Sequence, residues 1–343
     1  MKNIKQVFIL LMAIWMPPTL SSADISKVGT TSASFLKIAV GARALAMGEA
    51  YVSLANDASA LYWNPGGITA SSRTQVFLTH YDYISDLYYD YGAAVLPLGA
   101  AGVLGFHFSY LGMPDIERTT ILRPEGTGEM ISAQSYSAGI SYARALTDRF
   151  SIGGNGKLVK EQIWHSSASG LAIDLGLQYT SNFNNLKLGM SISNFGSPLK
   201  LSGRDLLVQH DIDESTEGNN SSINAILATD AFDLPILFRV GVSINLLKDV
   251  IGIQSQDLIL AVDAIHPNDN HEYLNMGMEY KPIPLLALRG GYRQLGLDDA
   301  NGGMTMGFGL NINLFNMTVN VDYAAADFGY FDMLNKFSIM LSF

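Results

Sequence analysis

Apolar and polar residues alternate along the C-terminal part of the chain. From Met304 to Leu314 every second residue is apolar, and the residues between them are threonine, glycine or asparagine. The same alternation runs through 317–323 and through 337–343, where the chain ends on Phe343. A period of two places apolar side chains on one face of a β-strand and the remaining side chains on the other. The pattern therefore predicts strands with one apolar face and one small, mostly polar face.

The length of these segments favours a membrane barrel. Strands of soluble domains usually have about 5–6 residues, whereas a tilted strand that crosses a membrane needs about 9–11. The alternating segments reach the second length, and their polar positions hold small residues rather than charged ones. A soluble β-fold also alternates and stays the alternative. We predict an all-β fold, a transmembrane outer-membrane β-barrel of antiparallel strands.

About fourteen alternating segments follow one another after residue 73. An even number is expected when both ends of a barrel lie on the periplasmic side. The predicted strands cover 74–83, 88–97, 101–110, 133–145, 150–161, 170–180, 186–194, 235–247, 256–266, 273–281, 285–293, 303–314, 316–325 and 336–343.

The links between the predicted strands test this topology. Counted from a periplasmic start, the even-numbered links should be short turns, and most are; the loosest is 248–255. The two long links, 111–132 and 195–234, are both odd-numbered and should lie outside the cell. Five tyrosines around the first hairpin suggest an aromatic girdle at a membrane interface, although tyrosine is also simply common in strands. They are Tyr81, Tyr83, Tyr88, Tyr89 and Tyr91.

Composition agrees with an exported barrel. Charged residues make up 15% of the chain, aromatic residues make up 10%, and there are 33 glycines. Low charge with many glycines and aromatics suits a lipid-facing surface around a tightly packed lumen. The chain has no cysteine, which excludes disulfides and thiolate metal sites, and its net charge of −10 argues against a nucleic-acid partner.

The N-terminus predicts a cleaved signal peptide. Lys2 and Lys5 precede an apolar run over 7–16, and small residues around Ala23 supply a cleavage site. We therefore expect export to the outer membrane of a Gram-negative-type bacterium. The expected divisions are a signal peptide at 1–23, a plug segment at 24–72 and the barrel at 73–343.

The stretch from Gly41 to Ile68 differs from the strands that follow. Its first half is rich in Ala, Leu, Met and Glu, which predicts a short buried helix. A turn and a strong helix stop follow, since Asn, Asp and Ser bond nearby backbone and Pro lacks an N–H. We expect this segment to plug the lumen. Its motif residues are Asn56, Asp57 and Ser59, expected to bond backbone or wall groups, and Asn64, Pro65 and Gly66, expected to reverse the chain.

This stretch, GARALAMGEAYVSLANDASALYWNPGGI, resembles the N-terminal signature of the PorV/PorQ family of outer-membrane proteins. That family is related in fold to the FadL long-chain fatty-acid transporters, whose plug carries a similar DDAS…NPAG run. The match covers 29–69, and further on only the strand pattern and the terminal Phe343 agree. Asn64-Pro65-Gly66-Gly67 replaces the Asn-Pro-Ala-Gly of the transporters, which favours PorV/PorQ.

The resemblance implies a component of the type IX secretion system. A PorV-like member binds the C-terminal signal domain of secreted cargo and passes it to the attachment machinery, to which a PorQ-like member itself belongs. The expected partners are outer-membrane lipid, secreted proteins with that domain and other secretion-system subunits. The resemblance to fatty-acid transporters implies instead a passive channel for hydrophobic molecules such as long-chain fatty acids. Neither role is enzymatic, and neither needs a cofactor.

Charged residues at inward positions are the candidates for chemistry. Two carboxylates are able to perform acid–base work, but no Ser, His and acid combination has a recognisable spacing. We therefore predict no catalytic residue, and interpret the charges as pairing across the lumen or holding the plug. They are Asp174, Lys187, Arg239, Asp263, Glu279, Arg289, Arg293 and Asp322. Inward glycines are expected to make room for the plug: Gly241, Gly277, Gly291, Gly307 and Gly309.

Three loop features remain. His266 and His271, with Asp269 and Glu272, suit a metal site or a solvated loop, and we favour the solvated loop. The acidic run Asp211, Asp213, Glu214 and Glu217 lacks the spacing and glycine of a calcium loop. We therefore predict no metal site. The long loop also holds a candidate partner-binding set, Ile223, Ile226, Leu227 and Phe232, with an ordinary outer-membrane loop as the alternative.

Overall fold

Fourteen long antiparallel strands close into one β-barrel. The computed structural model describes residues 27–212, 215, 222–297, 300–331 and 333–343. The barrel closes because the first strand pairs with the last, from Gln75 opposite Ser342 to His80 opposite Phe337. The signal peptide expected at 1–23 and the acidic residues Asp213, Glu214 and Glu217 lie outside the described residues.

Each of the fourteen predicted segments corresponds to one barrel strand. In order around the wall they are β1 (Gln75–Asp82), β2 (Tyr88–Pro97), β3 (Val103–Gly112), β6 (Ala133–Thr147), β7 (Phe150–Ile163), β8 (Ser166–Thr180), β9 (Lys187–Gly196), β15 (Leu237–Asn245), β16 (Asp257–Pro267), β17 (Tyr273–Ile283), β18 (Leu286–Leu295), β19 (Met304–Leu314), β20 (Met317–Asp327) and β21 (Met333–Ser342). Strand β8 begins before the predicted residue 170 because it stays paired with β7 up to the turn at Trp164 and His165.

The two ends of the barrel differ, as the link lengths predicted. One end, here called the turn end, carries short links and both ends of the barrel sequence. Its longer links contain η3 (Gly99–Ala101) and a π-helical turn, η5 (Leu246–Ile251). The opposite end, here called the loop end, carries the two long links and η6 (Gly329–Phe331). In outer-membrane barrels short turns face the periplasm and long loops face the outside.

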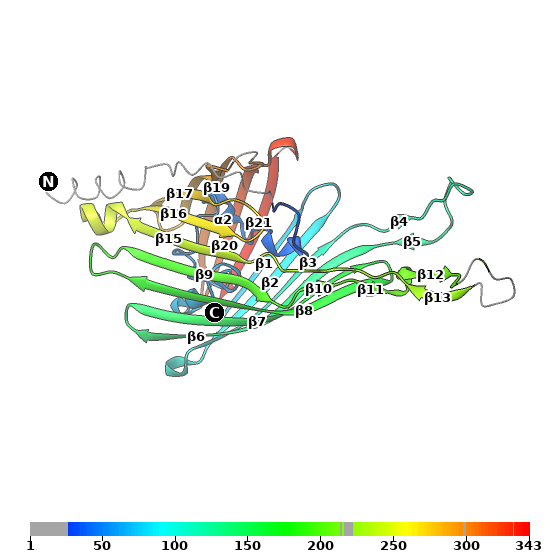
Figure 1. The fold of residues 1–343 in the computed structure, drawn as a ribbon. Coiled ribbons are helices and arrows are strands. Elements are labelled where there is room, and N and C mark those ends of the chain that lie inside the picture. Colours follow the sequence, from blue (N-terminus) through cyan, green and yellow to red (C-terminus); the bar gives the residue numbers. More distant parts are fainter. Residues whose placement is uncertain (1–26, 213–214, 216–221, 298–299, 332) are drawn as a thin grey trace.

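The long links form small hairpins that project past the barrel wall (Figure 1). The link after β3 contains β4 (Ile116–Glu117), paired with β5 (Met130–Ile131). The link after β9 contains β10 (Leu199–Lys200) paired with β14 (Ala231–Phe232), and β12 (Leu207–His210) paired with β13 (Ile223–Ile226). Between them β11 (Ser202–Gly203) pairs with β8 and is followed by η4 (Arg204–Leu206). Both long loops are therefore anchored by strands rather than irregular.

Strand alternation sorts the side chains onto two faces. Large apolar residues such as Phe106, Ile140 and Leu171 lie exposed on the outer surface, where lipid replaces water. The inward positions hold small and polar residues such as Ser141 and Asn155, which are buried. The tyrosine girdle prediction is largely wrong: Tyr81, Tyr89 and Tyr91 are at most 3% exposed and face inward, because they occupy the inward positions of β1 and β2.

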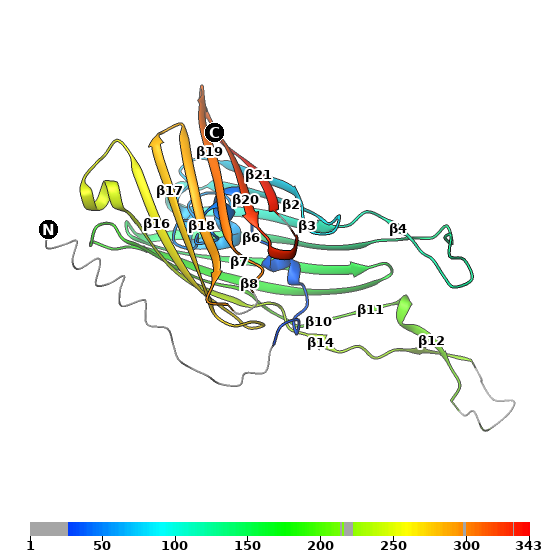
Figure 2. The same ribbon diagram turned by 90° about the horizontal axis from the view of Figure 1, so that it is seen from above.

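Residues 34–70, here called the N-terminal segment, lie inside the barrel (Figures 1 and 2). It contains η1 (Ser34–Lys37), α2 (Ala42–Ala46), α3 (Ala60–Trp63) and η2 (Pro65–Ala70). Its apolar side chains form most of the buried core, so the core lies inside the barrel. Within the described part of the chain, no helix has the length and apolar character to cross a membrane.

Candidate functional site

Wall side chains bind the backbone of the N-terminal segment. Asp263 Oδ2 accepts hydrogen bonds from the N–H groups of Tyr51 (2.7 Å) and Val52 (2.8 Å). Thr305 Oγ1 accepts one from Gly48 N (3.0 Å), a few residues earlier in the segment. Short helices and turns leave backbone N–H groups without partners, and burial makes an unpaired group costly. The barrel therefore supplies acceptors that the segment lacks.

The first three motif residues form a local network. Asp57 Oδ1 accepts from Ser59 N (2.9 Å) and Ser59 Oγ (2.5 Å), and Asp57 Oδ2 accepts from the Tyr51 hydroxyl (3.1 Å). Asn56 Oδ1 accepts from the guanidinium of Arg43 (3.2 Å). This is the Asp-to-backbone bonding that starts a turn, so the sequence order of these residues accounts for the local fold.

The second three motif residues join the segment to the wall. The Asn64 amide donates to Val52 O of the segment and to Leu177 O of the adjacent strand β8, both at 2.9 Å. Asn64 is also the N-cap of η2, which begins at Pro65: its Oδ1 accepts from Gly66 N (3.1 Å) in the first turn. One buried amide thus holds two parts of the segment and a barrel strand together.

Inward glycines allow the wall to approach the segment backbone. A Cβ at Gly277 would lie 2.2 Å from Met47 O, and one at Gly291 would lie 2.3 Å from Gly48 N. A Cβ at Gly241 or Gly307 would instead meet a side chain of the segment, Val52 Cγ1 at 2.4 Å or Ala46 Cβ at 2.6 Å, and would lie still closer to wall atoms. Gly309 differs, because its neighbours are the side chains of Asp322 and Arg289 rather than the segment.

A buried ion network joins the segment to β17, β18 and β20. Glu279 is fully buried and its Oε2 accepts from Arg43 Nε (2.9 Å) and Arg289 Nε (2.6 Å). Its Oε1 lies 3.0 Å from Lys281 Nζ, and Arg289 Nη1 reaches Asp322 Oδ1 at 2.6 Å. Buried charges persist when they are paired and hydrogen-bonded, so this network is a structural connection.

A second network surrounds Asp174, which the sequence predicted as an inward charge without identifying its partners. Asp174 Oδ2 accepts from Lys157 Nζ (2.8 Å) and Asn155 Nδ2 (2.6 Å), and Lys157 also donates to Asn194 Oδ1 (2.6 Å). Lys157 and Asn155 occupy alternate inward positions of β7. Asn155 lies opposite Asp174 in the β7–β8 pair, and Lys157 follows two residues later on the same face. The alternation of inward and outward residues along β7 was therefore the signal that could have identified both partners.

Three inward cations lie toward the loop end. Arg293 pairs with Glu49 of the segment (2.8 Å). Arg239 lies 5.3 Å from the centre of the Trp63 ring, and Lys336 donates to Ala39 O beside the Tyr81 ring. Lys187, in contrast, is exposed at the turn end. Of the eight inward charges, those contacting the segment directly are Arg239, Asp263, Glu279 and Arg293.

The candidate metal ligands between β16 and β17 lie in different surroundings. His266 Nδ1 donates to Glu272 Oε1 (2.8 Å), and both side chains are mostly exposed. Bonds from its own backbone N–H and from His266 hold the pKa of Glu272 below its usual range. Asp269 is instead buried against the segment, where it accepts from Thr31 and Lys37. Among the described residues, no group of three or more His, Asp or Glu could hold a metal ion.

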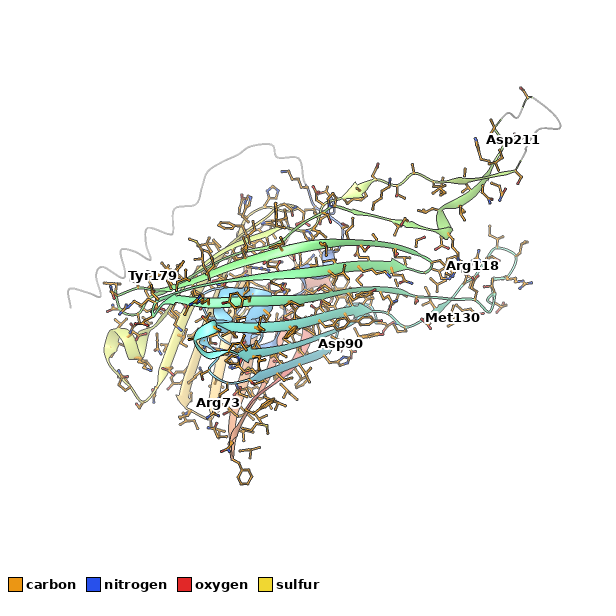
Figure 3. All side chains as sticks on the ribbon, turned by 90° about the horizontal axis from the view of Figure 1, so that it is seen from below. Arg73, Asp90, Arg118, Met130, Tyr179 and Asp211 are labelled. Carbon is orange, nitrogen blue, oxygen red and sulfur yellow. The ribbon has the colours of Figure 1, made fainter. Side chains whose placement is uncertain are left out.

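The four candidate partner-binding residues do not form one cluster. Ile223 and Ile226 lie on β13, opposite His210 and Leu207 of β12, and Ile226 is 71% exposed. Leu227 follows on the same projecting hairpin, whereas Phe232 lies on β14 nearer the wall. In Figure 3, Arg118 and Asp211 mark the two projecting loops, at the end opposite Arg73 and Tyr179. The long loops thus divide into a distal hairpin and a part that covers the wall.

The N-terminal segment separates two cavities of the lumen. The cavity at the turn end has a volume of about 630 Å³, and Arg43, Asn56 and Asp57 of the segment line it. The cavity toward the loop end has about 390 Å³, and Leu45, Glu49 and Trp63 line it. The segment therefore stands across the lumen between them.

Solved structures with a similar fold include two toluene transporters and a FadL homologue. The Pseudomonas putida toluene transporter TodX aligns over 88% of this chain and 97% of its own, with 14% identity and a TM-score of 0.55. The Ralstonia pickettii toluene transporter TbuX covers 89% and 97%, with 12% identity and a TM-score of 0.53. A Pseudomonas aeruginosa FadL homologue covers 87% and 96%, with 12% identity and a TM-score of 0.51.

Sequence comparison gives a more specific result. No curated protein sequence matches the chain. A family model described as "Type IX secretion system protein PorV" matches residues 21–232, which is more than half of the chain. This range includes the N-terminal segment, strands β1 to β9, the first long loop and most of the second. The chain is therefore an outer-membrane β-barrel that belongs to the PorV family of type IX secretion system proteins.

Proposed function

We propose that the protein acts as a PorV-like shuttle, which binds the C-terminal signal domain of secreted cargo and passes it to the attachment machinery. One observation carries the proposal. At the loop end, two hairpins project beyond the barrel and expose large aliphatic side chains, among them Ile121, Leu122 and Ile226. Large exposed apolar side chains on a structured projection are typical of a protein-binding surface.

In this proposal the N-terminal segment is a plug with a structural role. Its polar groups are bonded to the wall, and its charges are paired in buried networks. Cargo recognition then takes place at the loop end, outside the membrane, after the chain has been exported with a cleaved signal peptide. No catalytic step is required for such a role.

Shortening the distal part of the long loop tests the proposal. Replacing 204–228 by a short turn keeps β10, β11 and β14, and surface loops tolerate such changes at little free-energy cost. We expect normal amounts of heat-modifiable barrel in the outer membrane, with loss of co-purifying cargo and accumulation of cargo in the periplasm. Replacing only 211–221 by a glycine-serine stretch of equal length is the matched control. Normal export from the shortened protein would refute the shuttle.

A passive channel for hydrophobic molecules such as long-chain fatty acids is the second candidate. It is favoured by an apolar cavity of about 550 Å³ at the loop end and by the fold shared with toluene transporters. A channel places its affinity in such a pocket rather than in the distal hairpin. The shortening of 204–228 leaves the lining of this cavity in place. If the shortened protein exports cargo normally and still takes up a long-chain fatty acid, the channel replaces the shuttle.

A further inference from the structure

The apolar cavity at the loop end has a defined position. It is enclosed by the loop-end residues of β3, β6, β7 and β8 and by the part of the link after β9 that covers them. Its volume of about 550 Å³ is within the range of ligand-binding pockets, about 300–1,000 Å³. The apolar side chains of its wall include Leu111, Ile163, Leu199, Leu201 and Phe232. The cavity is thus built by the barrel rim and the loop together.

The charged groups of this cavity have one sign. Among its described lining residues only Glu161 and Asp230 are ionisable at neutral pH, and both are acidic. Asp230 is exposed, whereas Glu161 is partly buried on the inward face of β7. Glu161 Oε2 accepts from Ala33 N (3.0 Å). Its other oxygen, Oε1, accepts no hydrogen bond from the described residues.

Glu161 differs in this respect from Glu279 and Asp174, whereas Asp263 resembles it: Asp263 Oδ2 accepts only from backbone N–H groups and its Oδ1 has no partner among the described residues. Glu279 contacts three cations at 2.6–3.0 Å, and Asp174 contacts Lys157 at 2.8 Å. In the described part of the chain Glu161 has no ion pair, although apolar side chains surround it. A carboxylate beside an apolar wall is stabilised when a cation reaches it. The described lining residues of the cavity supply no cation for Glu161.

We propose that the cavity receives a lysine side chain of a protein partner, with its ammonium donating to Glu161 Oε1. The four-carbon stem of lysine packs on apolar surface while its charge reaches a polar group. Arginine fits less well, because its planar fork prefers two carboxylate oxygens and Ala33 already occupies Oε2. The partner is the cargo domain, so this inference rests on the proposed function and names one of its contacts.

The size of the cavity favours a protein segment over a free amine. One lysine side chain fills only part of about 550 Å³, so flanking partner residues have room against Leu199 and Phe232. Phe232, one of the candidate partner-binding residues, therefore contributes here rather than with the distal hairpin. The shuttle would thus contact its cargo at two places, the projecting hairpin and this cavity.

A small-molecule probe tests the cavity without cargo. Full-length protein in lipid nanodiscs is titrated with hexylammonium and with hexanol, and binding is measured by calorimetry. We expect hexylammonium to bind about tenfold more tightly than hexanol, since a charge-assisted hydrogen bond exceeds a neutral one. Glu161→Gln keeps an acceptor for Ala33 N and should remove the difference. Glu272→Gln, an exposed carboxylate on another loop of the same end, should leave it unchanged. Equal binding of both probes to the wild type would overturn the proposal.

Cargo with modified lysines tests the partner. A signal domain that co-purifies with the wild type is either acetylated, which removes lysine charge, or reductively methylated, which keeps it. We expect the methylated domain to bind and the acetylated domain to bind at least tenfold more weakly, with Glu161→Gln weakening the unmodified domain similarly. If the unmodified domain binds but acetylation has no effect, the lysine contact is wrong and the shuttle stands. If the unmodified domain does not bind at all, the shuttle fails, and the hexylammonium result still decides the cavity.

Discussion

The lumen and the loop end of this barrel differ in how far their groups are in contact with the rest of the protein. In the lumen, Asn64 and Asp263 satisfy backbone groups of the N-terminal segment, and Gly277 lets the backbones touch. At the loop end, the β12–β13 hairpin pairs with no third strand among the described residues, and Ile226 is 71% exposed. A two-stranded hairpin is at best marginally stable alone in water. These backbone groups of the segment therefore find their partners inside the barrel, whereas the loop end is suited to contact something else.

Removing Glu279 should have the largest effect on the lumen. Glu279→Leu leaves Arg43, Arg289 and Lys281 without their shared carboxylate. Breaking a buried ion pair by removing one partner costs about 3–5 kcal/mol. We expect a large fall in the temperature at which the folded band converts to the unfolded band in detergent gels. Glu272→Gln, in an exposed pair at the loop end, should change it little. Equal behaviour of the two variants would contradict the comparison.

The wall of the barrel could be predicted from the sequence because it follows a strict period. Each inward position is followed by an outward one, so the alternation from Met304 to Leu314 sufficed to place β19. Link lengths then fixed which end carries the long loops. The tyrosine girdle failed because residue type was used in place of that period: Tyr81, Tyr89 and Tyr91 alternate in the inward register.

The contacts of the lumen could be predicted only in part. Local turn chemistry predicted the bonds of Asp57 and Ser59, which are two residues apart. The pairing of Arg43 with Glu279, or of Lys157 with Asn194, depends on how far each strand is shifted against the next. Sequence alternation determines the face of a residue but not its height in the barrel. The cavity beside Glu161 was missed for the same reason, because β7 and the long loop that enclose it are not adjacent in the sequence.

Asn64→Ala with Pro65→Ala should loosen the N-terminal segment without unfolding the barrel. The change removes the amide that binds Val52 O and Leu177 O and leaves those buried carbonyls short of a donor. Each such group costs about 1–3 kcal/mol. We expect faster proteolysis within 34–70 and increased permeability to small solutes in liposomes. Unchanged proteolysis and permeability would mean that the segment is held without this motif.

Gly277→Ala should have a smaller effect of the same kind. The added Cβ would lie 2.2 Å from Met47 O, so the segment backbone has to move. Overpacking of this type costs about 1–3 kcal/mol in total. Gly156→Ala is the matched control, because a Cβ at this position on β7 meets nothing within 4 Å. We expect the first variant alone to lower the conversion temperature and to expose the segment to protease.

The smallest effect on stability is expected at the loop end. Leu207 and Ile226 face each other across the β12–β13 hairpin and are 48% and 71% exposed. Replacing both by serine should change barrel stability by less than about 0.5 kcal/mol, as is usual for surface substitutions. Cargo retention in the outer membrane should nevertheless fall, because burying these side chains against a partner would contribute about 1.5–3 kcal/mol each.

Ile140→Ser provides the contrast, since Ile140 is similarly exposed at 61% but faces lipid. That substitution should destabilise the barrel. Any fall in cargo retention should then follow the loss of barrel, not the loss of contact. If the hairpin variant instead loses stability while cargo retention per folded barrel stays normal, the hairpin supports the fold, and the distinction between a structural lumen and a partner-binding loop end fails.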